Sequence, residues 1–136
     1  MSKNRNDYWF ENLKKEHPEL LSGVHYASIG KGWNELVSNL CYKIAQYQKS
    51  VKDPSFEDPV VVQIKEKFGG LRFYFYGGDD YIRGMVDFAE SMSFSICEDC
   101  SKPGGAKGRG WIRTLCENCD QKEVSLLVAS ETQNNG

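Results

Sequence analysis

The sequence predicts an α+β fold in which helices pack on a small antiparallel β-hairpin and a C-terminal four-cysteine knuckle follows. Three observations predict it. Apolar residues recur at helical spacing in residues 33–47 and 82–92, two β-rich runs flank a glycine pair at 69–70, and two Cys-x-x-Cys pairs lie at 97–100 and 116–119. With 136 residues, 40% of them hydrophobic, the chain is long enough for one modest core with an appended module.

Three parts are expected along the chain. Residues 1–94 form the α+β core in the order helix, helix, hairpin, helix, residues 95–120 form a metal-binding module of the same domain, and residues 121–136 form a short helix and a frayed tail. The formal net charge of -2 removes the usual global argument for nucleic-acid binding. No signal peptide and no run of roughly 18 apolar residues is found, so we expect a cytoplasmic protein.

The first two elements are predicted helices. YWFENLKKE is expected to begin after a cap at Asn6 or Asp7 and to end at His17-Pro18, with an apolar face of Tyr8, Trp9, Phe10 and Leu13. The stronger pattern spans residues 32–50, where the apolar positions are Trp33, Leu36, Val37, Leu40, Cys41, Ile44 and Tyr47. Cys41 falls within this stripe, so we interpret it as a small buried hydrophobe and assign it no further role.

A hairpin is predicted next, because Gly69-Gly70 accepts the positive φ values that a tight turn requires. The alternation assigns one face to the core: Val60, Val62, Ile64, Leu71, Phe73 and Phe75. The opposite face carries Gln63, Lys65, Lys67, Arg72, Tyr74 and Tyr76. After a cap at Asp79-Asp80, a third helix is expected to bury Ile82, Met85, Val86, Ala89 and Met92.

The four cysteines after this helix have the spacing of a zinc site. Fifteen residues separate the pair Cys97 and Cys100 from the pair Cys116 and Cys119. Two residues between cysteines let one tight turn aim both thiolates at a single ion, and two such turns complete the tetrahedron that Zn²⁺ accepts. An iron-sulfur cluster or another metal, and redox dithiols, are the alternatives. The arrangement is typical of a zinc ribbon or a treble-clef-like knuckle.

The expected zinc is structural, because four cysteine ligands leave no position for water or substrate. His17-Pro18-Glu19 matches the first half of the nucleobase-deaminase pattern, but Ile96 and Leu115 stand where proline should precede a cysteine pair. His17 and His25 are otherwise interpreted as surface or core residues that do not act as a general base. Asp79 and Asp80 fit a helix cap better than acid-base chemistry. We therefore expect no enzyme and no small-molecule substrate.

The spacer between the cysteine pairs is basic and rich in glycine. It carries Lys102, Lys107, Arg109 and Arg113 with one aromatic residue, Trp111. Cations beside a stacking aromatic suit phosphates or single-stranded bases. The alternative is electrostatic, since zinc with four thiolates carries a formal charge of about -2 that nearby cations would compensate.

Three segments carry a resemblance to known proteins: GWNELVSNLC, QIKEKFGGLRFY, and the C-x-x-C to GW-x-x-TLC-x-x-C end. Together, over roughly residues 30–120, they resemble a family of small uncharacterised proteins of bacteria and their phages that have a four-cysteine zinc-ribbon-like motif. The resemblance implies a zinc-bearing accessory protein in the cytoplasm of a bacterial or phage-infected cell. Where such relatives have glycine after the first pair, this chain has Ser101.

The function expected first is a non-enzymatic, zinc-stabilised binding protein that docks on a protein partner, such as a host or defence protein, and modulates or inhibits it. The expected surface is Arg72, Tyr74 and Tyr76 on the hairpin together with Arg109 and Trp111 on the spacer, because Tyr, Trp and Arg dominate interface energies. The alternative for the hairpin aromatics is packing under the helices. The alternative function is nucleic-acid binding through the basic spacer, and neither function needs a membrane.

Overall fold

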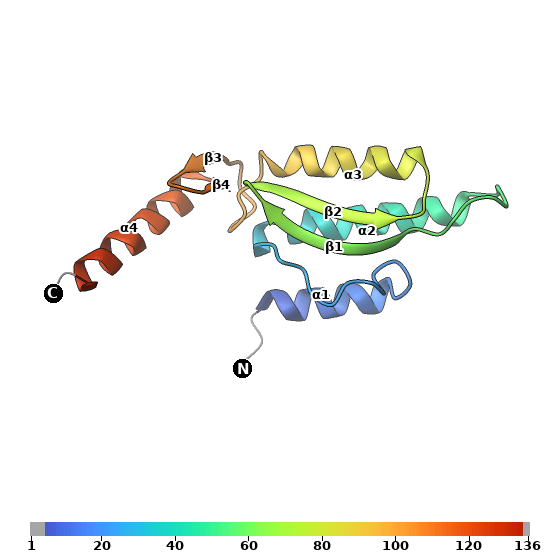
Figure 1. Cartoon of the computed structure of the whole chain (residues 1–136), viewed down its shortest axis with the longest axis horizontal. Helices are drawn as coiled ribbons and strands as arrows, with labels where there is room; N and C mark the ends of the chain where they lie inside the picture. The colour runs from blue at the N-terminus through green and yellow to red at the C-terminus, as the bar shows by residue number, and fades with distance from the viewer. Residues whose placement is uncertain (1–4, 135–136) are drawn as a thin grey trace.

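The computed structural model describes residues 5–134, and within them it confirms the α+β class, with four α-helices and two small antiparallel sheets. The elements in order are α1 (Arg5–Glu16), the 3-10 turn η1 (Lys31–Trp33), α2 (Asn34–Ser50), β1 (Val60–Lys67), β2 (Gly70–Tyr76), α3 (Asp80–Ser93), β3 (Gly105–Gly108), β4 (Ile112–Leu115) and α4 (Glu117–Asn134). Figure 1 shows α4 extending away from the body that the other helices and the β1–β2 hairpin form.

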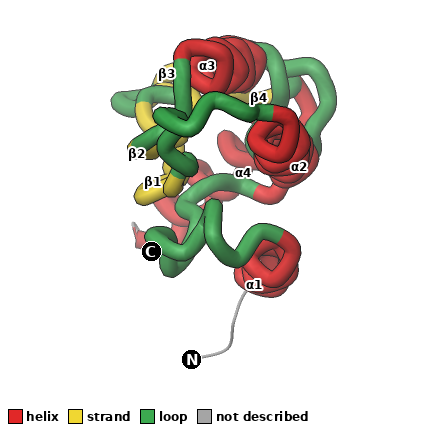
Figure 2. Tube along the Cα trace, turned by 90° about the vertical axis from the view of Figure 1, so that its right-hand side faces the viewer, coloured by secondary structure: helices red, strands yellow, loops and turns green. Residues whose placement is uncertain are grey.

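The β1–β2 hairpin has helices on one face only. Figures 1 and 2 show α2 behind the hairpin, α3 along its β2 side and α1 beside α2, and no helix described between residues 5 and 134 covers the opposite face of the hairpin. The indole Nε1 of Trp9 on α1 donates to Ser38 on α2 at 2.9 Å. The core between these elements is apolar, and its fully buried side chains include Leu21, Trp33, Val37, Cys41, Ile44, Val61, Ile64, Leu71, Phe73 and Ile82. Burial of Cys41 is thereby confirmed.

The hairpin turn lies one residue earlier than predicted. Lys67 pairs with Gly70, so the two turn residues are Phe68 and Gly69, with φ values of 54° and 79°. Positive φ at both positions is what the favoured two-residue hairpin turn requires. Gly70 is already in β2, where a Cβ would lie 2.4 Å from the ring of Phe94, so close ring packing explains the second glycine.

The buried face of β1 also differs from the prediction. The register shifts between Val61 and Gln63, and Val61 and Ile64 are buried while Val60 and Val62 are only half-buried. A bulge places an extra residue in one strand, so the side chains on one side of the bulge point to the opposite face from the one that simple alternation predicts. The predicted face is therefore correct from Ile64 onward and wrong before it.

Both edges of the hairpin find hydrogen-bond partners. On the β1 side, Ser28 N donates to Ile64 O at 2.9 Å, and Val61 N donates to Leu20 O at 2.8 Å. On the β2 side, Leu71 N donates to Ser93 Oγ at 2.9 Å. Phe73 N donates to Glu90 Oε2 at 2.8 Å, so two side chains of α3 act as acceptors for the strand.

The helix caps and faces are confirmed in part. Asp79 caps α3 by accepting from Ile82 N at 3.1 Å, as expected. Asn6 lies inside α1 and donates to Ile29 O, so neither it nor Asp7 is the predicted cap. The apolar faces of α1 and α3 are narrower than predicted because Tyr8 and Met92 are exposed.

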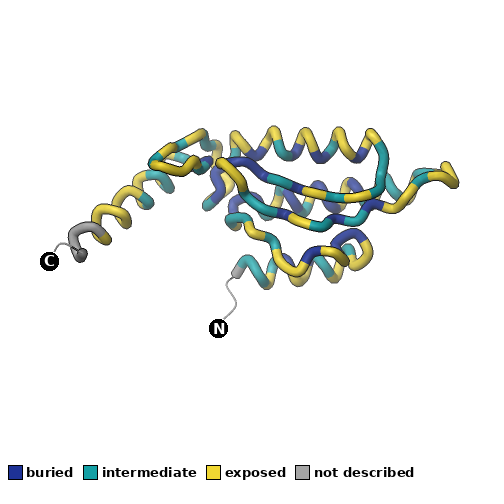
Figure 3. Tube along the Cα trace, in the orientation of Figure 1, coloured by how far each residue is buried: buried dark blue, intermediate teal, exposed yellow. Residues whose placement is uncertain are grey.

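The C-terminal helix is longer than predicted. It begins at Glu117, within the second cysteine pair, and spans 18 residues. Its outer part is largely exposed in Figure 3. The predicted frayed tail falls partly on residues 135–136, which lie outside the described residues. None of the helices described between residues 5 and 134 has the length and apolar character needed to cross a membrane.

Candidate metal centre

Three local elements bring the cysteines together. Cys97 and Cys100 lie on the turn after α3, which is closed by hydrogen bonds from Cys97 N to Lys102 O and from Ser101 N to Cys97 O. Cys116 lies between β4 and α4, and Cys119 lies in the first turn of α4. Ser101 has a φ of 73°, a conformation that favours glycine, which accounts for the glycine expected at this position from the resemblance.

The four sulfur atoms have the geometry of a metal site. All four Sγ atoms lie within 4.8 Å of one another, and those of Cys100 and Cys116 are 3.5 Å apart. A tetrahedral ion with Zn–S distances of about 2.3 Å places its sulfurs about 3.8 Å apart, whereas a disulfide requires about 2.05 Å. The four thiols therefore could hold a metal ion such as zinc, and all four predicted ligands are brought together.

The backbone assists one of the thiolates. Cys119 N donates to Cys116 Sγ at 3.4 Å, and this hydrogen bond lowers the pKa of Cys116 to about 7. A metal ligand must lose its proton, so a lowered pKa favours binding near neutral pH. Burial raises the pKa of the neighbouring ligand Cys119 to about 12, so the lowered pKa is confined to Cys116 within this pair. Burial raises the pKa of Cys41 to about 12 as well. Cys41 lies in the hydrophobic core and is not part of the cysteine cluster.

The first cysteine turn is bonded directly to η1. Gly32 N donates to Glu98 O at 2.7 Å, Ser101 Oγ donates to Gly32 O at 2.6 Å, and Trp33 Nε1 donates to Ile96 O at 2.8 Å. A Cβ on Gly32 would lie 2.1 Å from the carbonyl oxygen of Cys97, so only glycine allows this approach. This contact was not predicted from the sequence, although Gly30 and Gly32 beside Trp33 indicate a place where two backbone segments can approach closely.

A second joint connects the module to the hairpin turn. Thr114 Oγ1 donates to Gly69 O at 2.6 Å, and Thr114 N donates to Glu98 Oε2 at 2.6 Å. Both Thr114 and Glu98 are buried, and burial raises the pKa of Glu98. The cysteine module is thus fixed to the body at η1 and at the tip of the hairpin.

Most cations of the predicted basic spacer are already paired. Carboxylates of the knuckle and of α4 form ion pairs with these cations. Among the four predicted cations, only Lys102 forms no ion pair within the described chain. Burial disfavours the charge of Arg113, but hydrogen bonds to Glu123 and Asp99 keep its pKa above the ordinary value. The pairs are Lys107 with Glu117 (2.7 Å), Arg109 with Asp120 and with Glu123 (3.2 Å), and Arg113 with Glu123 (2.6 Å), Asp99 (2.9 Å) and Glu98 (3.7 Å).

The predicted surface residues fall into two separate places. Trp111 is exposed at the turn between β3 and β4. Tyr74 and Tyr76 are exposed on the outer face of β2, so the alternative that they pack under the helices is wrong. Arg72 lies half-buried on the same face. In Figure 1, β2 runs away from the β3–β4 hairpin, and the structure does not join the two groups into one patch.

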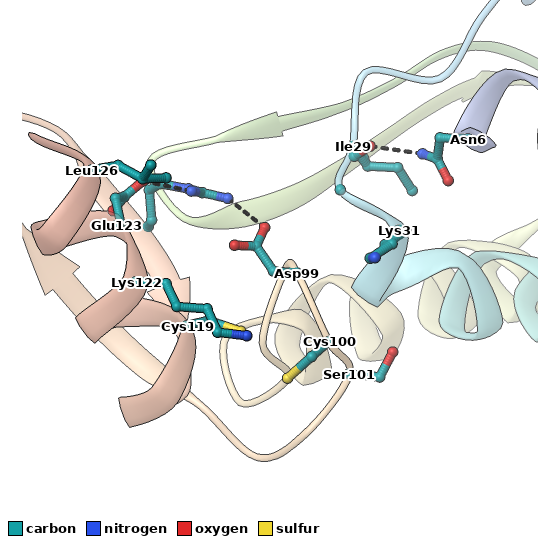
Figure 4. A pocket seen from close by; sticks show the side chains of 12 residues that line it. Asn6, Ile29, Lys31, Asp99, Cys100, Ser101, Cys119, Lys122, Glu123 and Leu126 are labelled. Carbon is teal, nitrogen blue, oxygen red and sulfur yellow. Dashed lines mark hydrogen bonds and ion pairs between the residues drawn. The ribbon is translucent and has the colours of Figure 1, made fainter. Parts of the chain in front are cut away.

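A cleft opens beside the cysteine cluster, between α4 and the segment before η1 (Figure 4). Its volume is about 1010 Å³. Lys122 and Leu126 line one wall, Ile29 and Lys31 line the other, and the Cys100 sulfur faces the space between them. The lining carries charges of both signs and no histidine, and no nucleophile with an adjacent base is found among its residues.

The fold and the site together define a small α+β protein with a four-cysteine cluster able to bind a metal ion such as zinc. No protein-family model, no curated protein and no solved structure matches the chain. The zinc-ribbon type of the knuckle and the resemblance to small bacterial and phage proteins therefore remain predictions.

Proposed function

We propose that this chain is a non-enzymatic binding protein that is stabilised by zinc and docks on a macromolecular partner. The cluster of four sulfur atoms within 4.8 Å carries the proposal. Four thiolates fill the coordination shell of zinc, so the metal holds structure and offers no position to a substrate. Closure of such a site contributes folding free energy that a chain of this size can use.

The two joints extend the influence of the metal beyond the module. One bonds the first cysteine turn to Gly32 on η1, and the other bonds Thr114 to the hairpin turn at Gly69. Zinc would therefore fix the relative positions of the knuckle and the hairpin. The exposed aromatic residues of the hairpin support a binding role, because aromatic side chains and arginine are enriched where proteins bind one another.

On sequence grounds a protein partner comes first. The resemblance to small phage and bacterial proteins is the reason to propose an accessory role in which the chain modulates or inhibits a host or defence protein. Nucleic acid is the second candidate. Its support comes from unpaired cations, and these lie on the hairpin more than on the spacer, where Lys107, Arg109 and Arg113 are paired.

Metal content tests the proposal directly. The purified chain should contain one zinc ion per molecule by mass spectrometric metal analysis, and Cys116→Ser should lose it. Cys41→Ala is the matched control, because it removes a buried cysteine outside the cluster and should keep the zinc. A wild-type chain without zinc, or a Cys116→Ser variant that retains it fully, would refute the metal assignment.

Recovery of the partner tests the binding role. The tagged chain is isolated from its native cells with and without nuclease treatment, and the retained molecules are identified. A nuclease-resistant protein supports docking on a protein, and nuclease-sensitive material supports nucleic acid. Recovery of the free chain alone in both cases would count against a binding function.

A further inference from the structure

The outer face of the β1–β2 hairpin is basic and has no acidic side chain. It presents Gln63, Lys65, Lys67, Arg72, Tyr74 and Tyr76. Lys65 lies directly opposite Arg72 in the strand register, and like charges in this position destabilise a sheet. Within residues 5–134, neither side chain forms an ion pair with a carboxylate. Folding alone does not account for this pair.

Two tyrosines stand beside these cations. Tyr74 is 43% exposed and Tyr76 is 73% exposed, and both project from the outer face of β2. Residues two apart on a strand are separated by about 7 Å, so the rings are too far apart to stack on each other. The Lys65 ammonium lies 5.9 Å from the centre of the Tyr74 ring. The Tyr74 ring can therefore receive a flat ligand with a cation nearby, and the Tyr76 ring offers a second exposed stacking surface.

The hairpin turn adds a third aromatic residue in an unfavourable conformation. Phe68 has a φ of 54° and is 66% exposed, so its ring receives little burial in return. A bulky residue at positive φ is uncommon, and such outliers cluster at functional sites. Lys67 lies 5.6 Å from the Phe68 ring centre, which repeats the pairing of cation and ring seen at Tyr74.

The face is open to a ligand along its length. Figures 1 and 2 agree that α2 lies behind the hairpin and α3 along its β2 side, and no helix described between residues 5 and 134 covers this face. The backbone groups at the hairpin edges already bond to Ser28 and to side chains of α3, so recognition would come from the side chains of the face.

We infer that this face binds single-stranded nucleic acid, with its tyrosines stacking on unpaired bases and Lys65, Lys67 and Arg72 contacting phosphates. Proteins that bind single strands combine these two features, and stacking requires bases that are free of a duplex. The inference rests on the proposed binding function and names the partner class. It also moves the site predicted on the spacer to the hairpin. Three of the four spacer cations are in ion pairs, whereas within residues 5–134 Lys65, Lys67 and Arg72 form none.

The expected salt dependence follows from the number of cations. Three phosphate contacts predict a slope of about -2 for the logarithm of affinity against the logarithm of salt concentration, at about 0.7 per contact on a single strand. Affinity should therefore fall about 20-fold between about 50 and 200 mM salt. A docking surface without phosphate contacts would show no such fall.

The test uses the zinc-loaded full chain and fluorescein-labelled oligothymidylate and oligouridylate, with binding followed by fluorescence anisotropy. Arg72→Gln should weaken binding and reduce the salt slope by about 0.7. Tyr74→Leu should weaken binding roughly 5- to 150-fold, whereas Tyr74→Phe keeps the ring and should bind as the wild type does. Arg109→Gln on the spacer is the control and should leave affinity unchanged. Zinc content and circular dichroism verify that each variant is folded.

Several results would overturn the inference. One is the failure of both oligonucleotides to bind the zinc-loaded chain. Another is binding that survives Arg72→Gln and Tyr74→Leu but is lost in Arg109→Gln, which would return the site to the spacer. If oligonucleotides fail while a nuclease-resistant protein binds and is lost in Tyr76→Ala, the face docks on protein and only the proposed function stands. If neither oligonucleotide nor protein binds, both proposals fall.

Discussion

Gly32→Ala should separate the cysteine knuckle from the body of the protein. The added methyl group would lie 2.1 Å from the carbonyl oxygen of Cys97 and 2.6 Å from that of Glu98. Real Cβ atoms do not approach this closely, and the atoms they would meet are backbone. Rotation of a side chain cannot relieve the overlap, so η1 and the cysteine turn must move apart.

The cost can be worked out from the bonds that cross this contact. Separation would break the hydrogen bonds from Gly32 N to Glu98 O and from Ser101 Oγ to Gly32 O, and it would strain the bond from Trp33 Nε1 to Ile96 O. A typical hydrogen bond contributes about 1 kcal/mol to stability. The free energy of unfolding should therefore fall by about 2–3 kcal/mol.

Urea unfolding of the zinc-loaded chain measures this change, with Gly84→Ala as the matched control. Gly84 lies on α3 with nothing within 4 Å of a Cβ. Alanine is a better helix former than glycine, so the control should be stabilised by up to about 1 kcal/mol. The same substitution thus has opposite signs at the two sites.

The metal should decide the size of the effect. When a chelator removes zinc, the cysteine turn is no longer held against Gly32, and the penalty of Gly32→Ala should fall below about 1 kcal/mol. A zinc-loaded Gly32→Ala variant within about 0.5 kcal/mol of the wild type would refute the close contact. Equal penalties with and without zinc would refute the idea that metal maintains it.

Three further substitutions test other contacts. Tyr47 donates a hydrogen bond to Asp79 at 2.5 Å, and this bond lowers the pKa of the Asp79 carboxyl. The bond therefore stabilises the fold at pH values above the ordinary pKa of aspartate. This stabilisation is lost as the pH falls through the pKa of Asp79 in the folded state. Tyr47→Phe should therefore be less stable than the wild type near pH 6, with a gap that closes below about pH 4 in urea unfolding; a gap independent of pH would contradict this cause. Phe68→Asn should raise the free energy of unfolding by roughly 1 kcal/mol because asparagine tolerates positive φ, and a loss of stability would mean that the ring packs. Thr114→Val leaves the Gly69 carbonyl without its donor and should cost about 1–3 kcal/mol in thermal unfolding, whereas an unchanged midpoint would disprove that bond.

The sequence predicts the elements better than their registers. The stripe of α2 was readable because its apolar residues follow a helical period, and its centre is buried as expected. Val60, Val61 and Val62 are equally apolar, so no alternation shows which of them faces the core, and the bulge could not be foreseen. The glycine pair fits a turn at either of two positions, and only strand pairing selects Phe68 and Gly69.

The metal ligands were predictable, but the surroundings of the spacer were not. Spacing alone identifies two cysteine turns that can share one ion, and the four sulfurs do cluster. The partners of Arg109 and Arg113 are Asp120 and Glu123, which lie on α4. Because α4 begins earlier than predicted, these carboxylates reach the β3–β4 hairpin. The ion pairs depend on that tertiary arrangement.

The hydrogen bonds from Leu71 and Phe73 to α3 have a consequence for how the chain behaves at high concentration. A two-stranded sheet with free backbone groups is a template for another strand, and it promotes aggregation or exchange of strands between molecules. Ser93 and Glu90 occupy two of these donors on β2, and residues 20–28 occupy part of the β1 edge. The hairpin can thus expose an aromatic binding face while its edges resist pairing with strands of other molecules.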